Sequence, residues 1–317
     1  MKPIAITLGD PAGIGPETIA KAFRDAPDAT QGCFVAGDVG TMRRASALVS
    51  GPGQPALPVA LIATPADVAG VPPQCIPVLQ IAELLAPVPF GQVSALAGKV
   101  AADCVLWVSR AALRGELAAL VTAPLHKEAL AAAGLPYPGH TELLQFEAAA
   151  YLGQPLHEVP VRMMLANDEL RTVLVSIHMS LRQAIEAATF DNVLQTLRIT
   201  HRSVGAALGR APRIGVAGLN PHAGEGGLFG REEIDTIIPA LQAARAEGLD
   251  VHGPFAPDTV FMRARAKNGQ PGEFDVVVAM YHDQGLIPVK YLGVEQGVNV
   301  TLGLPLVRAR TRRSTGA

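Results

Sequence analysis

The sequence predicts an α/β protein with a largely parallel sheet. Short apolar runs rich in β-branched residues alternate with longer stretches whose apolar residues recur at helical spacing, and this alternation favours parallel strands joined by helices. The chain has 32 Gly and 26 Pro residues, as many short strand–helix connections require. Because 317 residues are many for one core, we expect two domains or one large α/β domain.

The composition narrows the class of protein. Hydrophobic residues make up 49% of the chain and charged residues 17%, which is typical of a soluble globular protein with a generous core. A net charge of −2 gives no electrostatic footprint for nucleic acid or an anionic membrane, and no apolar run approaches the roughly 20 residues that span a bilayer. Cys33, Cys75 and Cys104 are widely spaced, which favours reduced thiols in a cytoplasmic protein.

Local patterns predict individual elements. The first half of the chain predicts a strand at 3–8, a helix ending near residue 25, strands at 33–36 and 59–62, a helix at 93–115 and a strand at 117–121. The second half predicts a helix from about 140 to 152, paired strands at 161–165 and 171–177, helical stretches to about 208, a strand at 213–219, a helix at 230–247 and a strand at 276–280. The last run is unbroken and rich in valine, which indicates a strand buried on both faces.

The first strand leads into a glycine-rich loop, residues 9–17. Pro16 suits a first helical turn, and the negative charge of Glu17 is favourable against the helix dipole. The glycines are similar to a phosphate-binding loop, but Thr18 stands where the dinucleotide fingerprint needs its third glycine. A tight strand–helix turn is the alternative interpretation.

Three histidines each close an apolar, strand-like run: His178, His222 and His282. Ligands of open α/β sheets bind outside the carboxyl ends of the strands, and neutral imidazole is a common metal ligand. Three protein ligands would leave a coordination position for substrate, whose oxygen a metal polarises. The alternative is that the three histidines are unrelated. Glu225, in the glycine-rich loop around His222, is either a partner of the site or a solvated carboxylate.

A second group of residues suits an anion. His140 and Thr141 stand at a predicted helix start, where backbone N–H groups favour a phosphate, although simple helix capping is the alternative. Lys290 and Arg308 would add positive charge, unless they are solvated surface residues. Asn299 lies in the same final segment as Arg308.

These segments together resemble the 4-hydroxythreonine-4-phosphate dehydrogenase (PdxA) family over nearly the whole chain. The resemblance is carried by TLGDPAGIGPE, VTAPLHKEAL, PGHTELL, GLNPHAGEGG, AMYHDQG and GVNVTLGLPLVR. It implies a divalent metal (Zn, Mg or Co) bound by His178, His222 and His282, in a homodimer whose partner subunit supplies His282. It also implies substrate binding by His140, Thr141, Lys290, Asn299 and Arg308, with Lys290 assisting proton movement.

The family's fold is similar to isocitrate and isopropylmalate dehydrogenases, with two α/β/α domains and the active site in the cleft between them. The resemblance therefore implies a first domain from 1–125 plus 255–317, on the cofactor side, and a second from 126–254 for dimerisation.

The implied reaction is oxidation of the secondary alcohol of 4-phosphooxy-L-threonine by NAD, or by NADP. Decarboxylation then gives 3-amino-2-oxopropyl phosphate for pyridoxal 5'-phosphate (vitamin B6) biosynthesis. A sister branch of the family oxidises 4-phospho-threonate, and no residue decides between the two substrates. A phosphate acyltransferase-like protein, or an inactive ligand-binding homologue, are alternatives of other classes.

The last nine residues, 309–317, differ from the segment with which family members continue. They are rich in arginine and have no apolar face, so we expect them to be mobile and NAD binding to be weak.

Overall fold

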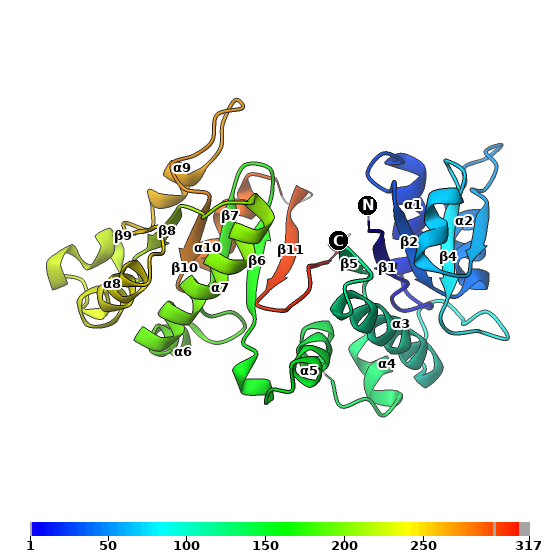
Figure 1. Cartoon of the computed structure of the whole chain (residues 1–317), viewed down its shortest axis with the longest axis horizontal. Coiled ribbons are helices and arrows are strands. Elements are labelled where there is room, and N and C mark those ends of the chain that lie inside the picture. Colours follow the sequence, from blue (N-terminus) through cyan, green and yellow to red (C-terminus); the bar gives the residue numbers. More distant parts are fainter. Residues whose placement is uncertain (1, 138, 294–295, 311–317) are drawn as a thin grey trace. The chain divides into compact units, whose positions relative to one another are not determined.

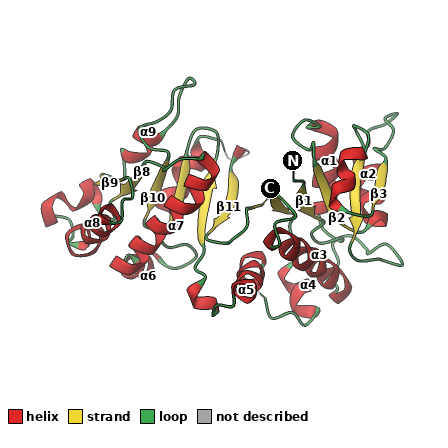
Figure 2. Cartoon of the chain, viewed as in Figure 1, coloured by secondary structure: helices red, strands yellow, loops and turns green. Residues whose placement is uncertain are grey.

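A computed structural model describes residues 2–137, 139–293 and 296–310 and divides the chain into two compact units (Figure 1). Unit 1 contains residues 2–160 and 304–310, and unit 2 contains residues 161–303. Helices alternate with strands within each unit, as Figure 2 shows, and the predicted α/β class is confirmed.

Unit 1 contains a parallel sheet. Its elements are β1 (Ile4–Thr7), α1 (Gly15–Asp25), β2 (Cys33–Gly37), α2 (Val39–Val49), β3 (Val59–Ile62), η1 (Pro65–Gly70), β4 (Ile76–Gln80), α3 (Ala95–Leu113), β5 (Ala119–Thr122), α4 (Lys127–Ala132), α5 (His140–Leu152), η2 (Leu156–Glu158) and β12 (Arg308–Arg310). The strand order is β3-β4-β2-β1-β5-β12, with every one of these neighbouring pairs parallel. Phe34 and Val35 of β2 belong to different apolar clusters, so helices cover both faces of the sheet.

Unit 2 contains a mixed sheet. Its elements are β6 (Arg162–Ala166), β7 (Arg171–Leu174), α6 (Leu181–Ala187), α7 (Phe190–Leu208), β8 (Ile214–Ala217), η3 (Pro221–Gly227), η4 (Glu233–Ile237), α8 (Ile238–Ala246), β9 (Val251–Phe255), α9 (Val260–Ala264), β10 (Val276–Ala279), α10 (His282–Tyr291) and β11 (Val298–Leu302). The strand order is β11-β6-β7-β10-β8-β9. The β11/β6 and β6/β7 pairs are antiparallel, whereas β7, β10, β8 and β9 run parallel.

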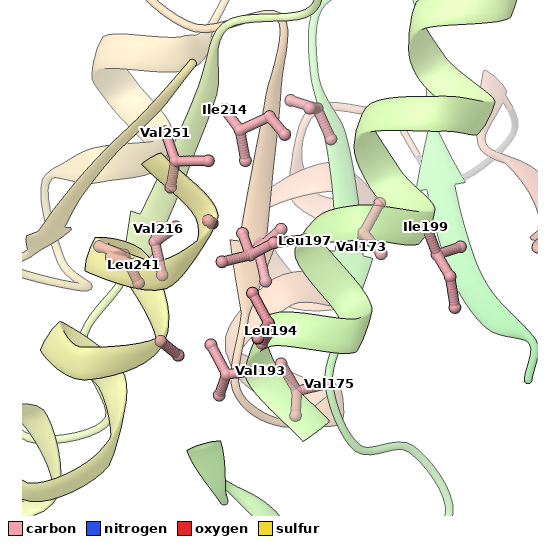
Figure 3. Packing of buried hydrophobic residues seen from close by; sticks show 14 of the residues in the cluster. Val173, Val175, Val193, Leu194, Leu197, Ile199, Ile214, Val216, Leu241 and Val251 are labelled. Atoms are coloured by element: carbon pink, nitrogen blue, oxygen red, sulfur yellow. The ribbon is translucent and has the colours of Figure 1, made fainter. Parts of the chain in front are cut away.

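The core of unit 2 confirms the prediction for the valine-rich strand. Val276, Val277 and Val278 are fully buried, and they alternate between two apolar clusters on opposite faces. On one face, Leu194 and Leu197 of α7 pack against the sheet residues (Figure 3). Burial on both faces is what an unbroken apolar strand requires.

The division into units differs from the expected domains. Residues 126–160 belong to unit 1, because α5 packs against α3 there. Residues 255–303 belong to unit 2, because β10 pairs with β7 on one side and β8 on the other. The boundaries predicted at 125/126 and 254/255 are therefore not those of the structure.

The end of the described chain also differs from expectation. Arg308–Arg310 forms strand β12, parallel to β5, where we expected mobile chain from residue 309 onward. Residues 311–317 lie outside the described residues, so the expectation for them stays a prediction. Within the described ranges, no helix has both the length and the apolar character that a membrane span needs.

Candidate functional site

His178 and His282 lie side by side because two neighbouring strands end together. The N–H groups of Val175 and Ser176 donate to the carbonyls of Ala279 and Met280, at 2.9 and 3.2 Å, so the parallel pairing of β7 with β10 continues beyond the strand ends. The ring centroids of His178 and His282 are consequently 5.6 Å apart, with an interplanar angle of 47°.

These two imidazoles line a pocket of about 620 Å³ within unit 2. Its lining residues are Ile177, His178, Met179, Ser180, Leu181, Gln183, Ala184, Tyr281, His282 and Asp283. Nδ1 of His282 is 2.7 Å from Oδ1 of Asp283, which leaves Nε2 of the ring for a ligand. The lining set contains no Lys or Arg, so a cation would meet no like charge from it. Two imidazoles are ligands of the type that a divalent metal binds, but a metal site needs at least one further protein ligand.

His222 lies on a turn of unusual backbone geometry. The φ angles of His222, Ala223 and Glu225 are 51°, 53° and 43°, in the left-handed region that L residues rarely adopt. The ring of His222 is 6.1 Å from that of Phe229. Among the residues that the structure describes, no three His, Cys, Asp or Glu side chains of this single chain form a group that would hold a metal ion. Glu225, which the sequence left open as a partner, is exposed.

The residues predicted to bind substrate belong to both units. Lys290, half-buried in the last turn of α10, and Asn299, opposite Leu165 in the β11/β6 pair, are in unit 2. His140 and Thr141 begin α5 in unit 1, with His140 buried. The N-cap position is taken by Gly139, which rules out the simple capping role for either residue.

Arg308 is buried in the sheet of unit 1, which excludes the solvated surface role. Its side chain is 3% exposed, and Nη2 donates a hydrogen bond to Oγ1 of Thr122 at 3.0 Å. Thr122 lies next to Thr7 in the β1/β5 register, and the hydroxyl of Thr7 is fully buried. The carboxyl ends of these strands thus gather polar side chains around a buried guanidinium.

The loop after β1 is a tight turn. Oδ1 of Asp10 accepts the N–H of Ala12 at 2.8 Å, and the N–H of Asp10 donates to the carbonyl of Pro124 at 2.9 Å. Gly9 has a φ of 74°, and a Cβ there would lie 2.5 Å from that same carbonyl oxygen. Pro16 and Glu17 are in the first turn of α1, as predicted.

Sequence reasoning missed two residues that hold this machinery in place. Thr122 accepts the hydrogen bond of Arg308, and Glu233 accepts N–H groups of the His222 loop. Neither has a local signal: 186 residues separate Thr122 from Arg308, and 13 or 14 separate Glu233 from its backbone donors.

Imidazoles at the strand ends of an α/β fold, together with a buried guanidinium, are typical of enzymes that act on small anionic substrates. The family model of the pyridoxal phosphate biosynthetic protein PdxA matches residues 29–316. The chain belongs to the PdxA family and is a dehydrogenase, which confirms the resemblance and speaks against the acyltransferase alternative.

Relatives in this family carry two different names. The chain is 50% identical over 313 residues to a 4-hydroxythreonine-4-phosphate dehydrogenase of Beijerinckia indica, covering 99% of this chain and 87% of the relative. It is 41% identical to a D-threonate 4-phosphate dehydrogenase of Pectobacterium atrosepticum, covering 99% and 91%. A crystal structure of 4-hydroxythreonine-4-phosphate dehydrogenase from Klebsiella pneumoniae is similar with a TM-score of 0.86 at 40% identity, covering 100% of this chain and 92% of that chain.

Proposed function

We propose that the chain is a metal-dependent NAD dehydrogenase that oxidises the secondary alcohol of 4-phosphooxy-L-threonine, with decarboxylation to 3-amino-2-oxopropyl phosphate. The observation that carries the metal dependence is the adjacent pair His178 and His282, at 5.6 Å, in a pocket without basic lining residues. The choice of substrate is supported by the 50% identity to a relative of that name. D-threonate 4-phosphate is the alternative, because relatives at 41% and 42% identity are named for it.

The side chains have separable roles in this proposal. When bound, the metal supplies polarisation of the substrate oxygen and NAD supplies the hydride acceptor. Arg308 binds the substrate phosphate, since its guanidinium is held by Thr122 and is shielded from bulk water. His140, Thr141 and Asn299 orient the substrate, and Lys290 assists the movement of the hydroxyl proton.

We further propose that a second copy of the chain completes the metal site. The resemblance implies that the partner subunit supplies His282, whereas the structure already brings His178 and His282 of one chain together. No group of three potential ligands forms among the described residues of one chain. Large apolar side chains beside the candidate ligands are exposed, including Met179 at 44% and Leu181 at 59% near His178, and Leu228 at 73% near His222. Exposed apolar surface of this kind is typical of an interface.

The activity is tested by metal analysis of the purified protein and by NAD and NADP reduction with both substrates side by side. We expect a bound divalent metal and the higher kcat/KM on 4-phosphooxy-L-threonine. A higher value on D-threonate 4-phosphate would move the assignment to the alternative. Metal-free protein with no turnover on either substrate would favour the inactive homologue.

The shared site is tested by mixing inactive variants. His178→Ala, His222→Ala and His282→Ala should each lose metal and activity, because two remaining ligands bind weakly. The variants are then denatured and refolded together in pairs, so that mixed dimers form. If one histidine crosses from the partner, its variant restores one of the two metal sites of a mixed dimer when paired with either of the other variants. The pair of those two other variants restores none. If no pair regains activity, all three ligands come from one chain and the shared site is wrong.

A further inference from the structure

Glu233 is a buried carboxylate whose hydrogen bonds converge on the loop that carries His222. Glu233 is only 1% exposed to solvent. Oε1 accepts the backbone N–H groups of Leu219 and Asn220 at 2.7 and 2.8 Å, and Oε2 accepts Nδ2 of Asn220 at 2.9 Å. A buried carboxylate is costly unless hydrogen-bonded, so these contacts fix the loop and the carboxylate together.

The turn that follows these donors is strained. From His222 to Gly226 the φ angles are 51°, 53°, 80°, 43° and 65°, and three of these residues are not glycine. A left-handed conformation is unfavourable for an L residue, so the surroundings must hold such a turn. Leu219 and Asn220, whose N–H groups donate to Glu233, precede His222 by three and two residues. Without these hydrogen bonds the turn would relax, and the His222 ring would move with it.

Glu233 also contacts the turn directly. A Cβ added to Gly224 would lie 2.7 Å from Oε2 of Glu233, so a larger residue there would displace the carboxylate. Glu233 opens η4 (Glu233–Ile237), a π-helical turn, and such turns occur frequently at functional sites. Because η4 continues directly into α8, the helix holds the Glu233 carboxylate against the loop that carries His222.

We propose that Glu233 is a positioning residue that holds the His222 imidazole in the orientation that metal binding requires. This inference rests on the proposed metal role of His222. Groups that orient a metal ligand without touching the metal typically account for about 10- to 100-fold in metal affinity. Glu233 does so through the backbone rather than through the ring.

The test is Glu233→Gln, which keeps the size of the side chain. The oxygen that remains can accept the backbone N–H groups of Leu219 and Asn220, but the new NH₂ group then faces Nδ2 of Asn220, which is also a donor, so that hydrogen bond is lost. We expect the Kd for Co²⁺ or Zn²⁺, measured by chelator competition, to rise about 10- to 100-fold, and the visible spectrum of bound Co²⁺ to change. The matched control is Glu232→Gln, since Glu232 accepts Nδ2 of Asn220 at 2.7 Å but is less buried. Its Kd should change less than about threefold.

A second variant separates positioning from a merely structural role. Ala223→Gly, placed in the Glu233→Gln background, removes the left-handed cost at residue 223 and should restore part of the metal affinity. A structural role alone predicts a lower Tm of the metal-free protein with an unchanged Kd, and that result would overturn the inference. If Glu233→Gln does not fold, Gly224→Ala disturbs the same contact from the turn, and a wild-type Kd in that variant is equally contradictory.

The His222→Ala variant keeps the two proposals apart. Full metal binding by His222→Ala sinks the metal role itself. Loss of metal in His222→Ala, together with wild-type affinity in Glu233→Gln, sinks only the positioning role.

Discussion

Replacing Asp275 with Asn should destabilise unit 2 without affecting its metal affinity. Asp275 directly precedes β10, at the opposite end of the strand from His282. Its carboxylate accepts two hydrogen bonds from Arg210, at 2.7 and 2.8 Å, and the backbone N–H of Arg213 at 2.8 Å. The side chain of Asp275 is 8% exposed, so the interaction is shielded on the carboxylate side.

The magnitude follows from these contacts. Hydrogen bonds to charged groups contribute about 1.5–3 kcal/mol, and the exposure of Arg210 and Arg213, 52% and 37%, lets water replace part of the loss. We therefore expect a loss of about 1.5–3 kcal/mol in total rather than per bond. The control is Glu273→Gln, which weakens the solvent-exposed pair with Arg263 and should destabilise the protein less than Asp275→Asn.

The effect should depend on pH with a defined sign. The hydrogen bonds from Arg210, followed by those from Arg213, hold the pKa of Asp275 well below its usual range. A carboxyl group whose pKa is lowered on folding stabilises the protein above its unfolded pKa, about 3.9. The difference between wild type and Asp275→Asn should therefore be constant above about pH 5 and shrink as the pH falls below about 4.

Hydrogen exchange of the β8 and β10 amides is the suitable assay, because two units need not unfold together. Protection in these strands should fall in Asp275→Asn, while the metal Kd stays that of the wild type. A stability difference that grows below pH 4, or a loss no larger than that of Glu273→Gln, would refute the reasoning.

Two further predictions concern unit 1. Thr122→Val removes the acceptor of Arg308 and should lower kcat/KM about 10- to 100-fold on the phosphorylated substrate, whereas Thr122→Ser should retain activity; equal values for both would contradict the role of the hydroxyl. Gly98→Ala should destabilise unit 1 by about 1–3 kcal/mol in chemical denaturation, because the added Cβ would lie 2.0 Å from the carbonyl oxygen of Ala129. The control is Gly70→Ala, where the added Cβ has open space, and equal stability of the two variants would contradict the predicted clash.

Strong local patterns predicted much of the fold. The valine run of β10, the long helix α3 and the hairpin of β6 and β7 were all predicted from apolar spacing, and each is confirmed. Strand β4 was missed because Pro77 and the surrounding loop residues obscure a five-residue run. Helix α2 was missed although Asp38 caps it by accepting the N–H of Thr41. Strand β12 has no local signal, since only pairing with β5 makes it a strand.

The sequence indicated which strand ends carry histidines but not what holds them in place, and the roles of these residues stay predictions. The order of strands brings His178 and His282 together, and their positions at strand ends indicated this from the sequence. The left-handed backbone at His222 depends on Glu233, which no spacing rule connects to it. Domain boundaries were misplaced because sequence periodicity does not reveal which sheet a strand joins.

The strand order of unit 1 has a consequence for biosynthesis of the chain. Its last strand, β12, is made only after the whole of residues 161–303, although it lies beside β5. A ribosome therefore completes unit 2, which is continuous in sequence, while the sheet of unit 1 still presents an open edge at β5. Closing that edge joins residues 186 positions apart, a non-local step that folds slowly. The buried guanidinium of Arg308 arrives with that step, so the phosphate-binding role proposed for it becomes possible only after residues 161–303 have been synthesised.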